Sequence, residues 1–199
     1  MKADLELVEE VKAGDQRSFA ELVRRHQSGL LRVCARMTKD EETAEDVVQE
    51  SFVKAYRKIN TFEGRSSFKS WLYQIALNTA RNRLRANRFE TVNIDDVQIS
   101  SNATAEHILT GIDVRAILKV EVDKLPEKQR VALELRVYED LSFQEIAQIM
   151  DCPYDTAKAN YRHGLLKIKK ALEGNNMLKE WLGEGIDFFA EIENKVLEV

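Results

Sequence analysis

Two amide and two guanidinium side chains recur at helical spacing between residues 74 and 85. At about 100° per residue they share one narrow stripe of a helix, made of Gln74, Asn78, Arg81 and Arg85. Arginines hold phosphates and amides read base edges, so this set suits nucleic acid. Trp71 borders the stripe, and an aromatic face stacks well on an unpaired base. The alternative is a solvated amphipathic helix in which Trp71 is simply buried.

A second polar and basic set opens a helix near the C-terminal end. Ser142 and Glu145 form a capping box that starts a short helix, residues 151–154 form a turn, and a longer basic helix follows. This order is typical of a helix-turn-helix, whose second helix enters the major groove with its N-terminal half. That half holds Thr156, Lys158, Ala159, Asn160, Arg162 and His163. The alternative is an ordinary helical hairpin with a basic rim.

A third set of residues is mainly polar, but unlike the first two sets it contains no basic residue. Asp46, Gln49, Glu50 and Val53 share the face of a helix that points away from its apolar side. Such a face is either plain solvated surface or a docking site for a partner protein. The spacing alone leaves both interpretations open.

The charge distribution supports two contacts with a polyanion. The net charge is −4, yet residues 63–88 hold six bases and one acid, and residues 158–170 hold five bases and no acid. Residues 91–124 and the segment after Gly174 are acidic. Two basic patches between acidic segments fit two nucleic-acid contacts, with solvated helix faces as the alternative.

Other functional classes lack their signatures. No glycine-rich phosphate loop, GxSxG or HExxH motif occurs, and the histidines and cysteines have no zinc spacing. We therefore expect no enzyme, no catalytic residue, no cofactor and no metal. No apolar run approaches the roughly 20 residues that span a bilayer, and the start lacks a signal-peptide core, which predicts a cytoplasmic chain without membrane insertion. Cys34 and Cys152 fit core packing, and would be a redox pair only if the fold joined them.

The periodicity predicts an all-α protein with two small helical domains joined by a flexible linker. Asp15 caps a first long helix, residues 39–42 form a polar break, and a second helix precedes a loop at 60–67. Ser66 or Ser67 then caps a third helix that runs to about residue 87. Pro126 suits the first turn of a helix through residue 137. The predicted boundaries are a domain at 1–90, a linker at 91–111, a domain at 112–174 and an acidic extension at 175–199.

Three motifs arrive in the order found in one family. Residues 44–56, AEDVVQESFVKAY, resemble the polymerase-binding helix of sigma factor region 2. Residues 62–82 resemble the −10 recognition and melting segment of the extracytoplasmic-function group of the sigma-70 family. Residues 125–130, LPEKQR, and 141–147, LSFQEIA, resemble region 4, which reads the −35 element. The resemblance covers roughly residues 13–172, and regions 1 and 3 of housekeeping sigma factors have no counterpart.

The resemblance implies a sigma factor that binds core RNA polymerase, recognises −10 and −35 elements and helps to melt the promoter. It implies polymerase binding by Asp46, Gln49, Glu50 and Val53, against the clamp helices of the largest subunit, with the flap as a further contact. It assigns to the −10 element Phe62, Gly64, Arg65, Ser66, Ser67, Phe68, Trp71, Gln74, Asn78, Arg81, Asn82 and Arg85. It assigns to the −35 element Arg136, Thr156, Lys158, Ala159, Asn160, Arg162 and His163.

The resemblance also implies an anti-sigma factor, which could hold the chain at the membrane of a bacterial cell. Within the −10 segment, the loop at 62–67 would cradle a flipped base, and Asn78 would sit where the duplex first separates. The last helix departs from the family pattern, because Asp155 replaces a common glycine, and Asn160, His163 and Leu165 replace common arginines. These departures bear on which −35 sequence is read. A stand-alone helix-turn-helix regulator and a protein-interaction module are the rival interpretations.

Overall fold

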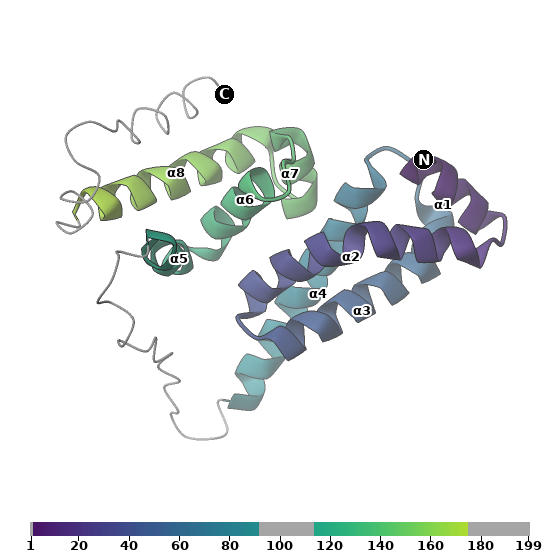
Figure 1. Ribbon diagram of the computed structural model, residues 1–199, viewed down its shortest axis with the longest axis horizontal. Coiled ribbons are helices and arrows are strands. Elements are labelled where there is room, and N and C mark those ends of the chain that lie inside the picture. Colours follow the sequence, from purple (N-terminus) through teal and green to yellow (C-terminus); the bar gives the residue numbers. More distant parts are fainter. Residues whose placement is uncertain (1, 92–113, 175–199) are drawn as a thin grey trace. The chain divides into compact units, whose positions relative to one another are not determined.

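The computed structural model describes residues 2–91 and 114–174, which are helical apart from turns and short loops (Figure 1). The elements are α1 (Asp4–Lys12), α2 (Gln16–Thr38), α3 (Glu41–Lys58), the 3-10 helix η1 (Ile59–Thr61), α4 (Phe68–Thr91), α5 (Val114–Asp123), α6 (Glu127–Val137), α7 (Phe143–Met150) and α8 (Tyr154–Glu173). No strand occurs in the described ranges, so the all-α prediction is confirmed there. Almost all of the predicted linker, and all of the predicted acidic extension, lie outside the described residues.

The chain divides into two compact units. The first spans Met1–Asp95 together with Glu134–Ala157, and the second spans Asp96–Leu133 together with Lys158–Val199. Helix α7 belongs to the first unit because it packs against α4. The domain boundaries drawn from the sequence follow the motifs rather than these contacts, and they stay a prediction.

The core of the first unit lies where α2, α3 and α4 pack against one another. Leu22 and Leu30 from α2, Val47 from α3, and Leu72 and Ala80 from α4 are completely buried. Burial of a large aliphatic side chain contributes on the order of 1.5–3 kcal/mol, so this three-helix core supplies most of the force that holds α4 in place. Helix α1 covers one end of α2 through Leu7, Val8 and Val11.

Short polar side chains set the helix ends. Asp15 accepts a hydrogen bond from the Arg17 backbone N–H at 3.0 Å, which confirms its predicted capping role. Lys39 ends α2 in the left-handed conformation, with φ 57°, and the Asp40 side chain immediately caps α3 by accepting from the Thr43 N–H at 2.7 Å. The predicted polar break is therefore only two residues long, because Glu41 already belongs to α3.

Serine caps start the two helices that carry the candidate motifs. The Ser67 hydroxyl accepts from the Ser70 N–H at 3.1 Å, which makes it the cap of α4. At α7 the predicted capping box is present: the Ser142 hydroxyl accepts from the Glu145 N–H at 3.2 Å, and the Glu145 carboxylate accepts from the Ser142 N–H at 2.9 Å. Both helices thus begin at positions fixed by the sequence.

In the second unit, the turn before α6 is tied by backbone and side-chain bonds. The Pro126 carbonyl accepts from the Gln129 and Arg130 N–H groups at 3.0 Å each, so Pro126 directly precedes the helix rather than lying within it. The Arg130 guanidinium donates to the Asp123 carbonyl at 3.2 Å. A Cβ atom on Gly164 of α8 would lie 3.4 Å from the Gln129 carbonyl, so this close approach favours glycine.

The capping box at α7 makes a measurable contribution to stability. We expect Ser142→Ala to lower the free energy of unfolding by about 1 kcal/mol, because the Glu145 N–H loses its acceptor. Denaturant unfolding followed by circular dichroism measures the change. Ser28→Ala, at an exposed interior position of α2, is the matched control and should be neutral or slightly stabilising. Equal effects of the two substitutions would contradict the capping role.

Candidate nucleic-acid interface

The predicted stripe of α4 lies partly on the surface. Asn78 and Arg85 are exposed, and Gln74 and Arg81 are half-buried. Asn78 lies between Leu77 and Thr79, which are buried, so the amide is held on a well-packed helix. Arg85 donates to the side-chain oxygen of Asn82, and this bond orients its guanidinium along the helix. The chain therefore presents an amide and a guanidinium on one rigid, solvent-facing helix.

Three aromatic side chains form a cluster where the loop meets α4. Phe62 and Phe68 are buried, with ring centroids 6.2 Å apart at nearly right angles. Trp71 is half-buried, and its ring centroid lies 5.1 Å from that of Phe62. Edge-to-face aromatic pairs of this kind stabilise a core beyond their area alone. Phe62 and Phe68 thus support the loop from below, while Trp71 keeps part of its surface accessible.

The loop between η1 and α4 is exposed and polar. Gly64 has φ 72°, a left-handed conformation that other residues rarely adopt, and after this turn Arg65 is exposed and Ser66 is half-buried. Arg65 pairs with Glu63 at 2.6 Å, and both side chains are largely exposed. The Lys12 ammonium donates to the Phe62 carbonyl at 2.8 Å and anchors the start of the loop to α1. The loop is therefore fixed at one end and open to solvent at its tip.

The polar face of α3 is exposed as the periodicity predicts. Asp46, Gln49, Glu50 and Val53 all lie on the surface. Asp46 forms an ion pair with Arg83 of α4, which links this face to the helix that carries the stripe. Glu50 pairs with Lys54 at 2.7 Å, and the Lys54 ammonium also donates to the Thr79 hydroxyl at 3.0 Å. Both acids on this face thus already have basic partners.

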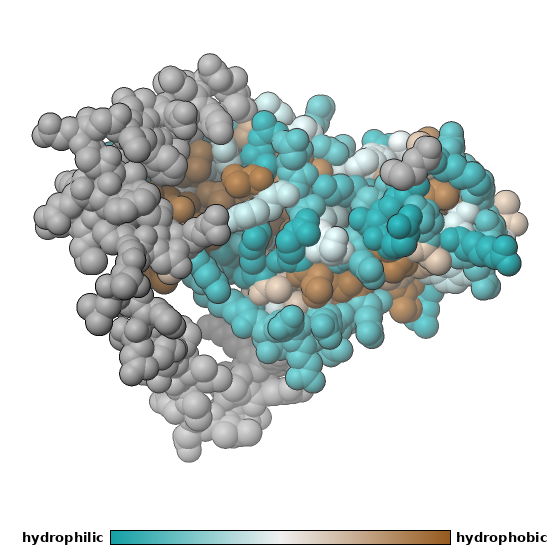
Figure 2. Space-filling model, viewed as in Figure 1, coloured by the Kyte–Doolittle hydropathy of each residue, from teal (hydrophilic) through white to brown (hydrophobic). Residues whose placement is uncertain are grey.

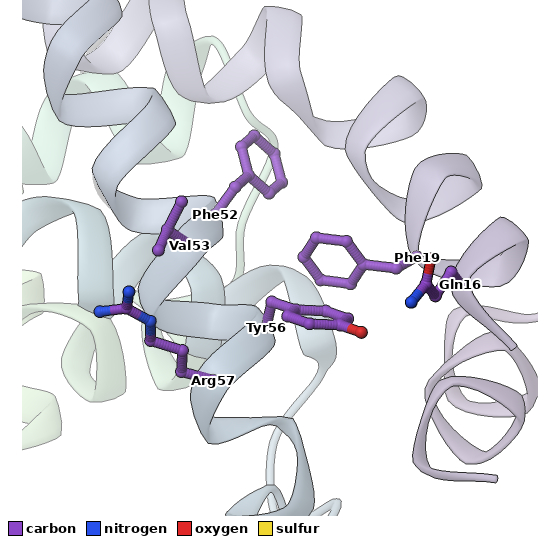
Figure 3. Close-up of a pocket in the computed structure, with 6 residues that line it drawn as sticks. All are labelled: Gln16, Phe19, Phe52, Val53, Tyr56 and Arg57. Carbon is purple, nitrogen blue, oxygen red and sulfur yellow. The ribbon is translucent and has the colours of Figure 1, made fainter. Parts of the chain in front are cut away.

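An open apolar groove lies between the start of α2 and the C-terminal half of α3. It has a volume of about 400 Å³ and is lined by Gln16, Phe19, Phe52, Val53, Tyr56 and Arg57 (Figure 3). The rings of Phe19 and Tyr56 meet at 63°, with centroids 4.9 Å apart. Figure 2 shows apolar residues gathered between α2 and α3, bordered by hydrophilic residues. Val53 belongs both to this groove and to the polar face of α3.

The short helix α7 is followed by a tight turn and the longer helix α8, as the sequence predicts. Asp151 ends α7 in the left-handed conformation, and the rings of Phe143 and Tyr154 meet edge to face, with centroids 6.4 Å apart. At the start of α8, Thr156, Arg162 and His163 are exposed, and Lys158, Ala159 and Asn160 are half-buried. Arg136 is half-buried; its guanidinium donates to the Leu141 carbonyl at 3.0 Å and lies over the Phe143 ring.

Sequence reasoning missed one polar cluster. The carboxylate of Glu139, only 5 % exposed, accepts from the Tyr73 hydroxyl at 2.8 Å and contacts the Lys69 ammonium at 3.1 Å and the Arg32 guanidinium at 3.0 Å. Burial acts to raise the pKa of Glu139, but the hydrogen bonds from Tyr73 and Lys69 outweigh it, so this pKa lies below its ordinary value. Glu139 is therefore a buried carboxylate ion. Lys69 and Tyr73 are i, i+4 neighbours beside the stripe, but no sequence pattern connects them with residue 139.

Cys34 and Cys152 are free thiols in the structure, and burial raises the pKa of Cys34 to about 12, in keeping with core packing. Across residues 2–91 and 114–174, no group of three or more histidine, cysteine, aspartate or glutamate side chains is placed to hold a metal ion. Over the same described residues, no helix has the length and apolar character needed to cross a membrane.

Comparison with known proteins identifies the family. The sigma-70 region 2 profile matches residues 22–90, and the sigma-70 region 4 profile matches residues 115–168. The chain is 38 % identical over 181 residues to the RNA polymerase sigma-H factor of Pseudomonas aeruginosa, covering 85 % of this chain and 94 % of that protein. It is 37 % identical over 167 residues to the ECF RNA polymerase sigma-E factor of Escherichia coli K12, covering 78 % and 87 %.

Solved structures share the fold. The sigma factor RpoE in complex with the anti-sigma factor NepR from Bartonella quintana matches with a TM-score of 0.67 and 24 % identity, over 80 % of this chain and 99 % of that one. CnrH in complex with the cytosolic domain of CnrY matches with a TM-score of 0.65 and 24 % identity, over 88 % and 100 %. The two matched regions and the curated relatives show that the chain belongs to the sigma-70 family, in its extracytoplasmic-function group, and that it directs promoter-specific initiation of transcription.

Proposed function

We propose that this sigma factor binds core RNA polymerase through α3, captures the −10 element with α4 and the preceding loop, and reads the −35 element with α8. The observation that carries the proposal is the exposed Asn78 between buried neighbours on α4, with Arg81 and Arg85 on the same stripe. Guanidiniums bind phosphate regardless of base, and an uncharged amide bonds a base edge or backbone group that appears when strands part. The arrangement suits melting as well as binding.

The α3 face supports the polymerase contact. Its polar residues lead into the apolar groove through Val53, and a mixed patch with an apolar centre and a polar rim is typical of a protein interface. We assign the clamp helices of the largest polymerase subunit to this face, through Asp46, Gln49, Glu50 and Val53. The flap of the polymerase is the proposed contact of the region 4 motif.

The loop and the region 4 motif complete the proposed DNA contacts. Arg65 is exposed and Ser66 is half-buried in the loop, and Trp71 follows in the first turn of α4, so a flipped base would find polar groups and an aromatic face there. Buried Phe62 and Phe68 serve this site by supporting the loop rather than by touching a base. In region 4, the exposed Thr156, Arg162 and His163 are the residues of α8 best placed for the major groove, with Arg136 holding the turn.

An anti-sigma factor is the proposed regulator. The two structural neighbours are described in complexes, one with the anti-sigma factor NepR and one with the cytosolic domain of CnrY. A regulator of this chain would mask the α3 face and the apolar groove, and it could hold the chain at a membrane. Reconstitution with core polymerase, followed by mapping of transcription starts, tests the function as a whole. Sequence-specific duplex binding without polymerase, together with no added starts, would favour a stand-alone regulator.

The polymerase contact is tested by comparing two neighbouring acids. We expect Asp46→Ala to weaken affinity for core polymerase by roughly 10-fold, the range of a moderate interface hot spot. Glu45→Ala removes the same charge from the same helix, but its side chain points about 100° away, so affinity should stay at the wild-type level. Fluorescence titration of labelled sigma factor with core polymerase measures both. Equal affinities for the two variants would contradict the assignment of this face.

The role of Asn78 separates melting from binding. Asn78→Ala removes no charge, so the salt dependence of DNA binding should be unchanged, whereas Arg85→Ala should flatten it. Loss of one base or backbone contact costs on the order of 1–3 kcal/mol, so open-complex formation on a duplex promoter should slow by roughly 5- to 150-fold. A template already unpaired across the −10 element should rescue most of the loss. Permanganate footprinting and abortive transcription on both templates measure this, and equal impairment on both would contradict a melting role.

A further inference from the structure

Helix α7 and the corner before it cover part of the proposed −10 surface within the first unit. The Gln74 amide donates to the Gln148 carbonyl of α7 at 3.0 Å. The Ser67 and Ser70 hydroxyls donate to the Glu145 carboxylate at 3.3 Å each. Two residues proposed for the −10 element, Gln74 and Ser67, thus already have partners in α7. Polar groups on the proposed DNA-binding side of α4 thus form hydrogen bonds with α7, which belongs to the region 4 motif.

The centre of this contact is the Glu139 carboxylate. Its two oxygens face the Tyr73 hydroxyl, the Lys69 ammonium and the Arg32 guanidinium, all within 3.1 Å. The Lys69 ammonium also donates to the Glu139 backbone carbonyl at 3.0 Å. The two positive charges of Arg32 and Lys69 exceed the single negative charge of the Glu139 carboxylate, and the Tyr73 hydroxyl adds a third donor. These three donors therefore form a site that can bind an oxyanion, whether it is a carboxylate or a phosphate.

Helix α2 leaves space for the Tyr73 hydroxyl and the Glu139 carboxylate. Gly29 lies in the interior of α2, where glycine costs about 1 kcal/mol relative to alanine. A Cβ atom at this position would come closest to the Tyr73 hydroxyl and would lie 2.8 Å from Glu139 Oε2, both closer than real Cβ contacts come. Near the same corner, the Arg36 guanidinium lies over the Tyr138 ring, 3.6 Å from its centroid. Gly29 thus leaves room for the Tyr73 hydroxyl together with the carboxylate that it binds, and Arg36 contacts Tyr138, the residue before Glu139.

Two of the three donors, Lys69 and Tyr73, lie on α4, the helix that is proposed to bind DNA, and the third, Arg32, lies on α2. Lys69 directly precedes Ser70, and Tyr73 directly precedes Gln74. Ser70 and Gln74 both lie on the side of α4 that α7 covers. A strand whose bases engage Gln74 and Trp71 would carry its phosphates along the edges of this surface. Arginine, lysine and tyrosine hydroxyl donors are common phosphate ligands in protein–DNA interfaces. The donor set therefore matches the backbone of the same strand.

We propose that Arg32, Lys69 and the Tyr73 hydroxyl form a binding site for a phosphate of the non-duplex −10 strand, and that Glu139 fills this site as an internal phosphate mimic when α7 covers α4. This inference rests on the proposed function of α4. A strand and the Glu139 corner compete for the same donors, so the free chain binds single-stranded DNA less well than its exposed basic residues allow. Core polymerase would relieve the competition by engaging α7 and α8 elsewhere.

The competition is tested on the full-length chain without polymerase. Fluorescence anisotropy measures binding of a short fluorescein-labelled single strand of mixed sequence. We expect Glu139→Gln to raise affinity by about 5-fold, and to steepen the slope of log K against log salt by about 0.7, the value for one added phosphate contact on a single strand. Tyr138→Ala, at a 51 % exposed position, removes the ring under Arg36 and should raise affinity in the same direction. It tests the proposal independently if Glu139→Gln impairs folding.

Two further variants separate the site from a general charge effect. Glu121→Gln, at a carboxylate paired locally with Lys124, makes the same change in net charge and should leave affinity at the wild-type level. Lys69→Gln added to Glu139→Gln should abolish the gain, because a phosphate ligand is removed with the mimic. Thermal unfolding followed by circular dichroism confirms that each variant is folded.

Each of the following results would overturn a different part of the proposal. Wild-type affinity in Glu139→Gln and Tyr138→Ala would overturn the competition. A gain that survives Lys69→Gln would overturn the assigned site. If inorganic phosphate at constant ionic strength displaces the strand from Glu139→Gln at micromolar concentration, the site serves free phosphate rather than the DNA backbone. Absence of polymerase-dependent transcription starts, with the strand competition intact, would overturn the proposed function and leave the anion site standing.

Discussion

One constraint governs the first unit: α4 must bury one side completely while its other side stays polar. Leu72, Ala76 and Ala80 are at most 2 % exposed, and Asn78 lies among them on the same helix and faces solvent. The apolar side fixes the position and rotation of α4 against α2 and α3. Because the core is close-packed, the polar side is held with little freedom, and a rigid platform loses little entropy when it meets a ligand.

The aromatic cluster likewise combines buried side chains with a polar surface. A loop that presents polar groups to solvent has few apolar contacts of its own, so it needs support from beneath. Phe62 and Phe68 provide that support by burying their rings, and the Lys12 ammonium fixes the loop's entry through the Phe62 carbonyl. Half-buried Trp71 joins the cluster to the surface. Stability and the proposed recognition therefore use neighbouring residues of one motif, but not the same ones.

Local signals made the fold largely predictable from the sequence. Capping residues such as Asp15 and Ser142 act within one turn, and helical periodicity identifies buried faces without knowledge of the partner helix. The stripe on α4 and the polar face of α3 were predictable for the same reason. The Glu139 cluster was not, because it joins residues 32, 69, 73 and 139 through tertiary contact, and Glu139 sits in a polar stretch that suggests a solvated turn. The role of Gly29 also depends on tertiary contact, because the Tyr73 hydroxyl and the Glu139 carboxylate occupy the space that a side chain at position 29 would need.

The ion pair between Asp46 and Arg83 joins α3, the helix proposed to bind polymerase, to α4, the helix proposed to bind DNA. A carboxylate that turns to a polymerase residue can no longer neutralise Arg83, so this cation becomes available to the nucleic acid at the moment the protein partner binds. Thermodynamic linkage makes the effect reciprocal: DNA that draws Arg83 away leaves Asp46 better able to bind polymerase. On the proposed function, one exposed ion pair thus gives the two binding events a coupling free energy, and the sigma factor binds each partner more tightly once the other is present.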